Sequence, residues 1–315
     1  MKYVILTEGG GKIGIGHITR CIALYQALEE KGDSVKLILS AEANLVDFIS
    51  GINCQRFNWV AEQDVISDLI IDYEFVIIDS YLAKVSLYNK ISEIKCGNLL
   101  MIDDCNRLEY PRGIVLNSLI YGKKLNYSRN EGVTYFLGED FVMLRKAFWE
   151  VPEKKINKEV KEVLITFGGV FNESLVEKIV DSLKCRFQFN VQILGGVKNK
   201  IDENKVLDLM INADICISAG GQTTYELARV GVPTIGICFT ENQRMNLEAW
   251  EETGFLQYAG WYNDLNLIDR LINKFEKIQF YDLRRKISQI GRNIVDGAGA
   301  RRISSLLHAK LEVGK

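Results

Sequence analysis

Short apolar runs alternate with stretches of helical periodicity along the first half of the chain. The run Tyr3–Leu6 is apolar and rich in β-branched residues, which predicts a buried parallel strand. From Ile18 to Lys31 the apolar residues fall largely on one helical face, which predicts an amphipathic helix. Alternation of this kind implies a parallel sheet that is covered by helices on both faces.

The alternation continues to residue 137. Further strands are expected at Ser34–Ser40, Phe75–Asp79, Leu99–Asp103, Ile114–Asn117 and Val133–Leu137, and helices at Ala43–Ser50, Gln63–Asp72 and Val85–Ile94. In open α/β sheets, ligands bind outside the carboxyl ends of the strands. The polar residues expected there are Glu8, Asp79, Tyr81, Asp103, Asp104 and Asn117. Each can act as a helix cap, but together with His17 they mark one rim of the sheet.

The composition changes between residues 149 and 162, where charged residues dominate. We expect a linker here, with a hinge for domain closure near Val151–Lys158. A second α/β set follows, with strands at Val163–Phe167, Phe189–Leu194, Ala213–Ser218 and Thr234–Phe239, helices at Ser174–Leu183 and Val206–Ile211, and amphipathic helices from Asp264 to Lys315. A chain of 315 residues suits two domains. The predicted organisation is residues 1–150 and residues 151–315.

Composition narrows the function classes. The net charge of −2 does not favour nucleic acid or an anionic membrane as the main partner. No apolar run approaches the ~18 residues of a membrane span, and the first strand lacks the features of a signal peptide. The seven cysteines are scattered without a C-x-x-C pair, and several lie in apolar runs, as buried thiols in a reducing cytoplasm would. No ligand cluster suggests a metal. We expect a cytoplasmic monomer.

A glycine-rich turn separates the first strand from its helix. It contains Gly9, Gly10, Gly11, Gly14 and Gly16. Glycines let the backbone approach a ligand closely, and the helix that follows offers free N–H groups and the positive end of its dipole. His17, one of two histidines, stands at that helix start, where the dipole favours the neutral imidazole that a general base requires.

Two other interpretations of this turn remain. Gly9-x-Gly11-x-x-Gly14 formally matches the dinucleotide fingerprint, but the second strand does not end in the acidic residue that would hold a ribose, because Glu42 is displaced into the loop. His17 can also be a capping or core histidine.

A second informative stretch runs from Ser218 to Thr234. Gly220, Gly221 and Thr223 lie at a helix start and form a plausible diphosphate cradle, and the absence of a Walker lysine excludes a P-loop. Glu226 can accept hydrogen bonds from ribose hydroxyls, or can simply complement the helix dipole. Gly168 and Gly169 follow the first strand of this half in the same way.

Two α/β domains with such turns resemble the MurG-type nucleotide-sugar fold (GT-B), in which two Rossmann-like domains have parallel sheets that face a central cleft. The segments Gly220–Glu226, Gly231-x-Pro233 and Asn242-Gln243 look like the nucleotide-binding segment of that fold. More specifically, the chain resembles the PseG family. The motifs are Ile13-Gly-Ile-Gly-His17-Ile-Thr-Arg20-Cys, Ile77-Ile-Asp79-Ser-Tyr81, Ile102-Asp-Asp104, Leu144-Arg145 and Asp296-Gly-x-Gly-Ala-x-Arg302-Ile.

The PseG family hydrolyses UDP-2,4-diacetamido-2,4,6-trideoxy-β-L-altropyranose in the biosynthesis of pseudaminic (nonulosonic) acid, a surface-glycan sugar. The resemblance implies that His17 activates water for attack on the anomeric carbon with inversion, that UDP leaves by C–O cleavage, and that Tyr81 and Asn242 line the sugar and water site. It implies no metal or cofactor. The substrate- and nucleotide-binding residues that we expect are Gly14, Gly16, Arg20, Asp79, Gly168, Gly169, Gly220, Gly221, Thr223, Glu226 and Gln243.

One position departs from the family pattern, because Ser80 stands where the family usually has His. This change bears on how the sugar is recognised. Two other function classes stay open. A glycosyltransferase would use the same UDP cradle and present His17 to an acceptor hydroxyl. A non-catalytic nucleotide-sugar binding protein would not need a base beside the glycine turn.

Overall fold

The computed structural model describes residues 1–10, 14–41, 51–128, 130–169, 172–195 and 202–313. The predicted helix Ala43–Ser50, Glu42, and Gly11 of the fingerprint lie outside the described residues. The chain divides into two compact units. Unit 1 comprises Met1–Lys146 and Ala298–Lys315, and unit 2 comprises Ala147–Gly297.

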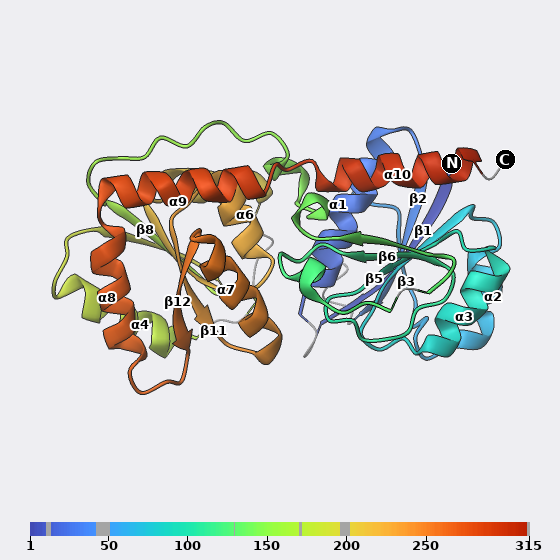
Figure 1. Ribbon diagram of the computed structural model, residues 1–315, viewed down its shortest axis with the longest axis horizontal. Helices are drawn as coiled ribbons and strands as arrows, with labels where there is room; N and C mark the ends of the chain where they lie inside the picture. Colours follow the sequence, from blue (N-terminus) through green and yellow to red (C-terminus); the bar gives the residue numbers. More distant parts are fainter. Residues whose placement is uncertain (11–13, 42–50, 129, 170–171, 196–201, 314–315) are drawn as a thin grey trace. The chain divides into compact units, whose positions relative to one another are not determined.

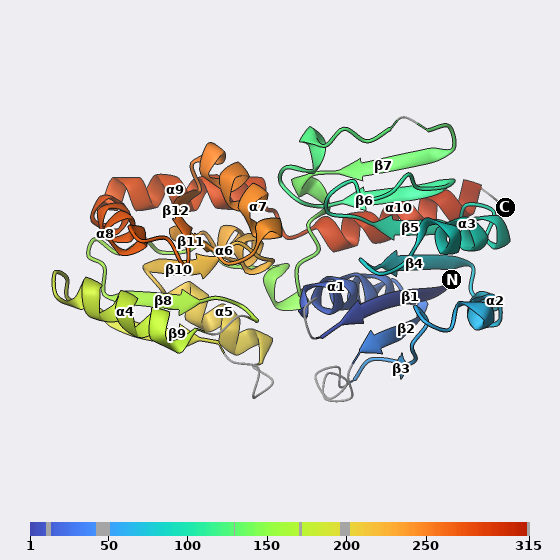
Figure 2. The same cartoon turned by 90° about the horizontal axis from the view of Figure 1, so that it is seen from below.

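Unit 1 is built on a parallel sheet with the strand order β3-β2-β1-β4-β5-β6-β7 (Figures 1 and 2). The strands are β1 (Lys2–Gly9), β2 (Ser34–Ala41), β3 (Cys54–Arg56), β4 (Phe75–Asp79), β5 (Leu99–Ile102), β6 (Gly113–Asn117) and β7 (Val133–Leu137). The central strands β4, β5 and β6 are buried along their whole length. Their sequences are therefore nearly continuous apolar runs, as expected for a sheet covered on both faces.

Helices cover both faces of this sheet. Helix α1 (Gly16–Glu30) packs beside the C-terminal helix α10 (Gly299–Val313), where the Ser304 hydroxyl donates to the carbonyl of Ala27 at 3.3 Å. Helices α2 (Ile66–Ile70) and α3 (Val85–Ile94) pack on a second core with alternate residues of β1, such as Val4 and Leu6. Since side chains alternate across a strand, one residue in two supports each layer.

Unit 2 repeats the architecture with the strand order β12-β11-β10-β8-β9, again parallel. Its strands are β8 (Glu162–Thr166), β9 (Asn190–Leu194), β10 (Ile215–Ala219), β11 (Thr234–Cys238) and β12 (Leu256–Trp261). Its helices are α4 (Glu173–Lys184), α5 (Glu203–Asn212), α6 (Thr223–Val230), α7 (Glu241–Thr253), α8 (Leu267–Ile278) and α9 (Tyr281–Ile294).

Three elements differ from the sequence prediction. The segment Gln63–Asp72 forms a 3₁₀ turn (Gln63–Val65) and the short helix α2 in place of one helix. Strands β3 and β12 were not predicted. Strand β3 is three residues long at a sheet edge, too short for a periodic pattern, and β12 contains Gly260 at φ +113°, which weakens the strand signal.

The charged segment after Trp149 is part of unit 2. Lys154 donates to the carbonyl of Ile211, Asn157 donates to Asp214 at 2.9 Å, and Arg284 donates to the carbonyl of Lys158 at 2.9 Å. These bonds argue against a hinge within Val151–Lys158. The chain passes between the units at Lys146–Ala147 and again at Gly297–Ala298.

The C-terminal helix also departs from the predicted boundary. Helix α10 belongs to unit 1, whereas the sequence prediction assigned every residue after 150 to the second domain. Ile303, Leu307 and Leu311 of α10 are buried. Periodicity predicts such an apolar face but not which unit covers it.

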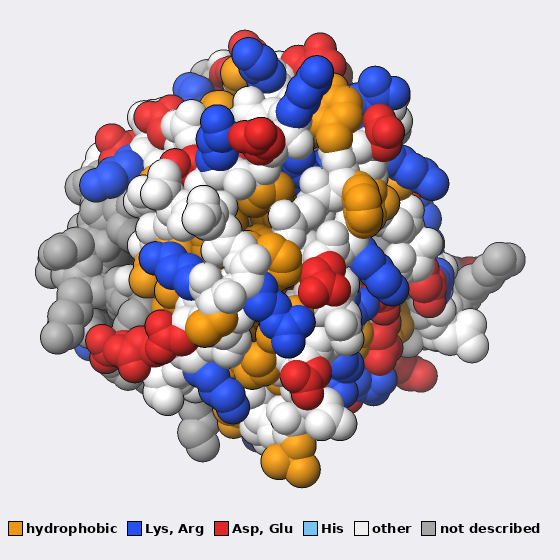
Figure 3. Space-filling model, turned by 90° about the vertical axis from the view of Figure 1, so that its left-hand side faces the viewer, with side chains coloured by type: hydrophobic (Ala, Val, Ile, Leu, Met, Phe, Trp, Pro, Cys, Tyr) orange, Lys and Arg blue, Asp and Glu red, His pale blue; other side chains and the backbone are white. Residues whose placement is uncertain are grey.

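The surface drawn in Figure 3 mixes basic and acidic side chains without a large region of one sign. This mixture agrees with the small net charge and gives that face no strong field for a polyanion. Within the described residues, no helix combines the length and apolar character needed to span a membrane.

Candidate functional site

The candidate site of unit 1 lies where the strand order changes direction. Successive strands run from β1 through β2 to β3 on one side of β1 and from β4 to β7 on the other. The carboxyl ends of β1 and β4 are adjacent, with Thr7 paired to Asp79. His17 is the second residue of α1, and Asp79 is the last residue of β4. Ligand sites of open parallel sheets occur at such switch points.

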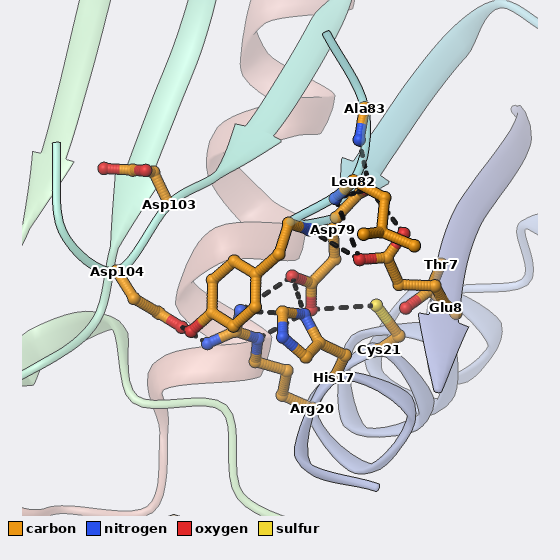
Figure 4. A network of polar contacts seen from close by, with 12 residues as sticks. Thr7, Glu8, His17, Arg20, Cys21, Asp79, Leu82, Ala83, Asp103 and Asp104 are labelled. Carbon is orange, nitrogen blue, oxygen red and sulfur yellow. Dashed lines mark hydrogen bonds and ion pairs between the residues drawn. The ribbon is translucent and has the colours of Figure 1, made fainter. Parts of the chain in front are cut away.

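His17, Arg20 and Asp79 form one hydrogen-bonded cluster (Figure 4). Nδ1 of His17 lies 2.5 Å from Oδ1 of Asp79. Arg20 donates to both carboxylate oxygens, with Nε 2.6 Å from Oδ2 and Nη2 2.6 Å from Oδ1. His17 and Arg20 are one helical turn apart on α1, so the helix geometry directs both side chains to the same carboxylate.

The charge state of Asp79 determines the tautomer of His17. Burial opposes ionisation of this carboxyl, but the charge of Arg20 and the hydrogen bonds from Arg20 and His17 outweigh it and hold its pKa well below the usual range. An ionised carboxylate only accepts, so Nδ1 of His17 carries the proton. Within the described part of the chain, no hydrogen bond engages Nε2. The ring therefore has one nitrogen left to accept a proton.

Tyr81 stands against His17 in the loop that follows β4. The two rings meet edge to face, with centroids 4.4 Å apart and an angle of 87° between their planes. The Tyr81 hydroxyl donates to Oδ2 of Asp104 at 2.5 Å, and Arg20 Nη1 donates to Oδ1 of the same carboxylate at 2.7 Å. Burial and the Asp104 charge raise the pKa of Tyr81, so its hydroxyl stays protonated. Arg20 thus bridges Asp79 and Asp104.

Gly14 and Gly16 are the described glycines directly before His17. The helix α1 has Ile15 at its N-cap without a side-chain cap, and no acidic residue in its first turn. Gly14 adopts φ +80°, where glycine is favoured, and among the described residues neither Gly14 nor Gly16 has another atom within 4 Å of the position a Cβ would take. No side chain in the described part of the chain caps the first N–H groups of α1, which is the arrangement of an anion-binding helix start.

Ser80 has a defined structural role. Its hydroxyl donates to Glu8 Oε2 at 2.6 Å and accepts from the amides of Leu82 and Ala83 at 3.1 and 2.9 Å. The residue that departs from the family pattern therefore caps the turn that carries Tyr81. A groove of about 610 Å³ adjoins this turn. It is lined by Glu8, Gly9, Gly10, Ser40, Ala41, Arg56, Phe57, Asn58, Glu62 and Leu82.

Unit 2 has its own switch point, between β8 and β10. Gly168 follows β8 at φ +63°, and a Cβ placed on it would lie 3.9 Å from Oγ1 of Thr223 at the start of α6. The structure thereby brings together the two glycine turns that the sequence analysis treated separately. Among the residues that the structure describes, neither Gly169 nor Gly221 has an atom within 4 Å of its Cβ position, which leaves room for a ligand.

Gly220 serves packing. A Cβ on Gly220 would lie 2.5 Å from Cγ of Leu247 and 3.0 Å from the carbonyl oxygen of Gln243. Gln243 also accepts the Phe239 amide at 3.1 Å, so its amide oxygen holds the strand-to-helix turn. Asn246 donates to the Gly220 carbonyl at 2.9 Å and accepts from Tyr225 at 2.6 Å.

The remaining predicted residues of unit 2 lie on α6 and α7. Glu226 is buried in the first turn of α6, and Asn242 is exposed in the first turn of α7, where it accepts from the Thr240 hydroxyl at 2.5 Å. The N-cap of α6 is Gln222, and within the described residues no side-chain hydrogen bond caps this helix start.

Some residues that shape the two sites were missed by the sequence analysis. Asn246 and Arg107 follow no motif, and only the fold shows what they hold. Glu8 and Asp104 were expected only as rim residues. Their partners could not be predicted because the rim carries several equivalent carboxylates. In the parts of the chain that the structure describes, no group of three or more His, Cys, Asp or Glu side chains could hold a metal ion.

Comparison with known proteins gives both sequence and structural relatives. No protein-family model matches the chain. An uncharacterized protein of Methanocaldococcus jannaschii is 27% identical over 78% of this chain and 57% of its own length. The Helicobacter pylori protein named pseudaminic acid cytidylyltransferase and UDP-2,4-diacetamido-2,4,6-trideoxy-beta-L-altropyranose hydrolase is 26% identical over 90% of this chain and 51% of its own length. The spore coat polysaccharide biosynthesis protein SpsG of Bacillus subtilis is 23% identical over 98% of both chains.

The chain therefore spans about half the length of the first two relatives and nearly all of the third. Among solved structures, MurG of Acinetobacter baumannii has a TM-score of 0.69 at 12% identity, covering 98% of this chain and 100% of its own. A putative UDP-N-acetylglucosamine 2-epimerase of Listeria monocytogenes has a TM-score of 0.64 at 14% identity, covering 99% and 97%. The predicted resemblance to a PseG-type protein and the predicted GT-B fold with two parallel sheets are confirmed.

Proposed function

We propose that this protein is a nucleotide-sugar hydrolase that releases UDP and a free 2,4-diacetamido-2,4,6-trideoxy sugar by C–O cleavage with inversion. The observation that carries the proposal is the contact of 2.5 Å between His17 Nδ1 and the buried carboxylate of Asp79. This contact fixes the ring orientation and leaves Nε2 as a proton acceptor. A histidine held in one tautomer by a carboxylate is the arrangement of a general base.

The chemistry follows from these groups. Nε2 of His17 takes a proton from water while the water oxygen bonds to the anomeric carbon, and the bond from that carbon to the diphosphate oxygen breaks. The electron pair leaves with UDP, a good leaving group, so the enzyme needs chiefly to orient the water and to stabilise the diphosphate. A positioned base contributes about 10²- to 10⁴-fold in rate. Tyr81, which contacts the His17 ring, is assigned to the sugar and water site.

We assign nucleotide binding to unit 2. The backbone of Gly169 and Gly221, which no described atom approaches at the Cβ positions, and the start of α6 suit a diphosphate, which helix N-termini bind through N–H groups and dipole. Thr223 lies beside Gly168 in this region, and Glu226 follows in the first turn of α6. Asn242 is assigned to the sugar by resemblance.

The names of the sequence relatives support the substrate class. One is named as a hydrolase of a UDP-diacetamido-trideoxy sugar, and another as a protein of spore coat polysaccharide biosynthesis. We further propose that the enzyme acts in the cytoplasm as a monomer. Light scattering coupled to size-exclusion chromatography tests the monomeric state.

A glycosyltransferase is the second candidate. The observation that favours it is the fold itself, since solved structures with this fold include several proteins named as glycosyltransferases. In that reaction His17 would remove the proton of an acceptor hydroxyl in place of water. Because one fold supports many reactions, fold similarity does not decide between the two.

Incubation with UDP-2,4-diacetamido-2,4,6-trideoxy-β-L-altropyranose in ¹⁸O-water tests the proposal. We expect UDP without label and free sugar with label at the anomeric oxygen, without any added acceptor or metal, followed by mass spectrometry and NMR. Label in UDP would mean attack at phosphorus and would contradict the role of His17. UDP binding without turnover, and turnover restored by an added acceptor, would support the transferase.

A further inference from the structure

The loop that carries Tyr81 is held by two side chains of opposite charge. This loop, Ser80 to Ala83, connects β4 to α3 and is neither helix nor strand. Its backbone groups therefore cannot obtain partners from a regular ladder and must find them elsewhere. Glu8 at the end of β1 and Arg107 after β5 supply several of them.

Glu8 accepts hydrogen bonds from the donor groups of the loop. Its Oε1 accepts the Tyr81 amide at 2.6 Å and the Leu82 amide at 3.1 Å, and its Oε2 accepts the Ser80 hydroxyl at 2.6 Å. The side chain is 1% exposed. Hydrogen bonds to a buried ionised acceptor are stronger than neutral ones, and they fix the geometry of their donors.

Arg107 donates hydrogen bonds to carbonyl groups of the same loop. Its Nη2 donates to the Ser80 carbonyl and its Nη1 donates to the Ala83 carbonyl, each at 3.0 Å. Arg107 is itself held, because its own amide donates to Asp103 Oδ1 at 3.1 Å. The guanidinium is a rigid planar fork, so two bonds to one loop fix the spacing of that loop.

We infer that Glu8 and Arg107 are positioning residues that clamp the 80–83 loop and thereby set where the Tyr81 ring stands against His17. The inference rests on the proposed catalytic function of His17 and Tyr81. At its far end Tyr81 is held by Asp104, and at its backbone by Glu8. A misplacement of about 1 Å in a catalytic arrangement can cost roughly 10²-fold in rate.

The sequence offers a direct spectroscopic test, because the protein has two histidines. The centroids of the His17 and Tyr81 rings lie 4.4 Å apart, so the ring current of Tyr81 acts on the His17 ring, whereas His308 lies with Asp33 in another part of unit 1. In NMR spectra of Glu8→Ala and Arg107→Ala, we expect the His17 ring protons to shift while those of His308 do not. The matched control is Glu74→Ala, which removes a carboxylate that accepts the Lys2 amide at the opposite end of β1.

Kinetics provide the second readout. Glu8→Ala is expected to lower kcat by about 10- to 100-fold with little change in KM. Glu8→Gln keeps an acceptor oxygen for the two amides and should recover most of that loss. In a double-mutant cycle with Tyr81→Ala, which removes the ring that the clamp positions, we expect the effect of Glu8→Ala to be much smaller than in the wild type, because Glu8 acts through the Tyr81 ring.

The outcomes separate this inference from the proposed function. An unshifted His17 signal in folded Glu8→Ala overturns the clamp, and so does additivity in the cycle. If the wild-type protein turns over no UDP-sugar, the proposed function fails, while the NMR comparison still decides whether Glu8 and Arg107 set the contact between Tyr81 and His17.

Discussion

The imidazole of His17 and the phenol ring of Tyr81 meet edge to face, with centroids 4.4 Å apart. The two residues come from different elements, the first turn of α1 and the loop after β4. Arg20 connects the two, because it donates hydrogen bonds to Asp79, the partner of His17, and to Asp104, the partner of Tyr81. A change at either carboxylate is therefore expected to disturb both rings.

Replacing the proposed base should remove catalysis and spare nucleotide binding. For His17→Ala we expect a loss of about 10²- to 10⁴-fold in kcat, because water would lack a proton acceptor. Affinity for UDP, measured by calorimetry, should stay close to that of the wild type, since we assign nucleotide binding to unit 2. His308→Gln is the matched control and should keep its activity. Wild-type turnover by His17→Ala would contradict the assignment.

Removing the Asp79 carboxylate should lower both stability and activity. In Asp79→Asn the buried Arg20 loses one of its two carboxylates, and breaking a buried ion pair typically costs about 3–5 kcal/mol. The amide can also donate to Nδ1 and favour the wrong tautomer, so kcat should fall by at least the order of 10² in a variant that is still folded. Urea unfolding and steady-state kinetics measure the two effects. An active and equally stable variant would show that Asp79 does not orient His17.

The same carboxylate predicts an acid-dependent loss of stability. Burial opposes ionisation of Asp79, but Arg20 and His17 lower its folded pKa below the value of about 3.9 expected in the unfolded chain. The folded state then binds fewer protons than the unfolded state, so this contribution is full above about pH 4 and is lost as the pH falls toward the folded pKa. Between pH 5 and pH 3, the unfolding free energy of the wild type should fall more than that of Asp79→Asn. Parallel curves would exclude this role.

Two adjacent glycines should respond differently to alanine. Gly220→Ala places a Cβ 2.5 Å from Leu247 and 3.0 Å from the backbone oxygen of Gln243, so we expect a loss of about 1–3 kcal/mol from overpacking. Gly221→Ala meets no atom of the described residues within 4 Å and should leave the unfolding free energy unchanged. If its backbone cradles the diphosphate, the added methyl should still weaken UDP binding. Wild-type UDP affinity in Gly221→Ala would show that the Gly221 backbone does not hold the diphosphate.

Lys154 predicts a change of stability on the alkaline side. Burial lowers its folded pKa to about 8, although Asp214 counteracts this, whereas the unfolded value is about 10.4. Between these values the unfolded state binds more protons, so stability should rise with pH, by up to about 1.4 kcal/mol per pH unit for one proton. Urea unfolding from pH 7.5 to 9.5 should show this rise in the wild type and a weaker one in Lys154→Met. Equal slopes would mean that the Lys154 ammonium is not desolvated.

The sequence alone predicted most of the strands and both glycine turns. The apolar run Phe75–Ile78 matched β4 because a strand buried on both faces is apolar along most of its length. The run Val133–Leu137 matched β7, although this edge strand is only partly buried. The strands β3 and β12 were not predicted because their apolar pattern is short or interrupted. The position of His17 after the turn was also predictable, since a helix start is encoded locally by the glycines and the periodicity that follows.

What remained undetermined were the partners. The sequence shows four equivalent carboxylates at strand ends: Glu8, Asp79, Asp103 and Asp104. In the fold, Asp79 hydrogen-bonds His17 and Arg20, Asp104 accepts from Tyr81, and Glu8 accepts from the loop backbone. Likewise, α10 carries an apolar face that periodicity reveals, but only the fold shows that unit 1 covers it. Local patterns determine which elements form and which face is apolar. Strand order and the crossing of distant segments decide which charged groups meet, because those contacts depend on residues far apart in the chain.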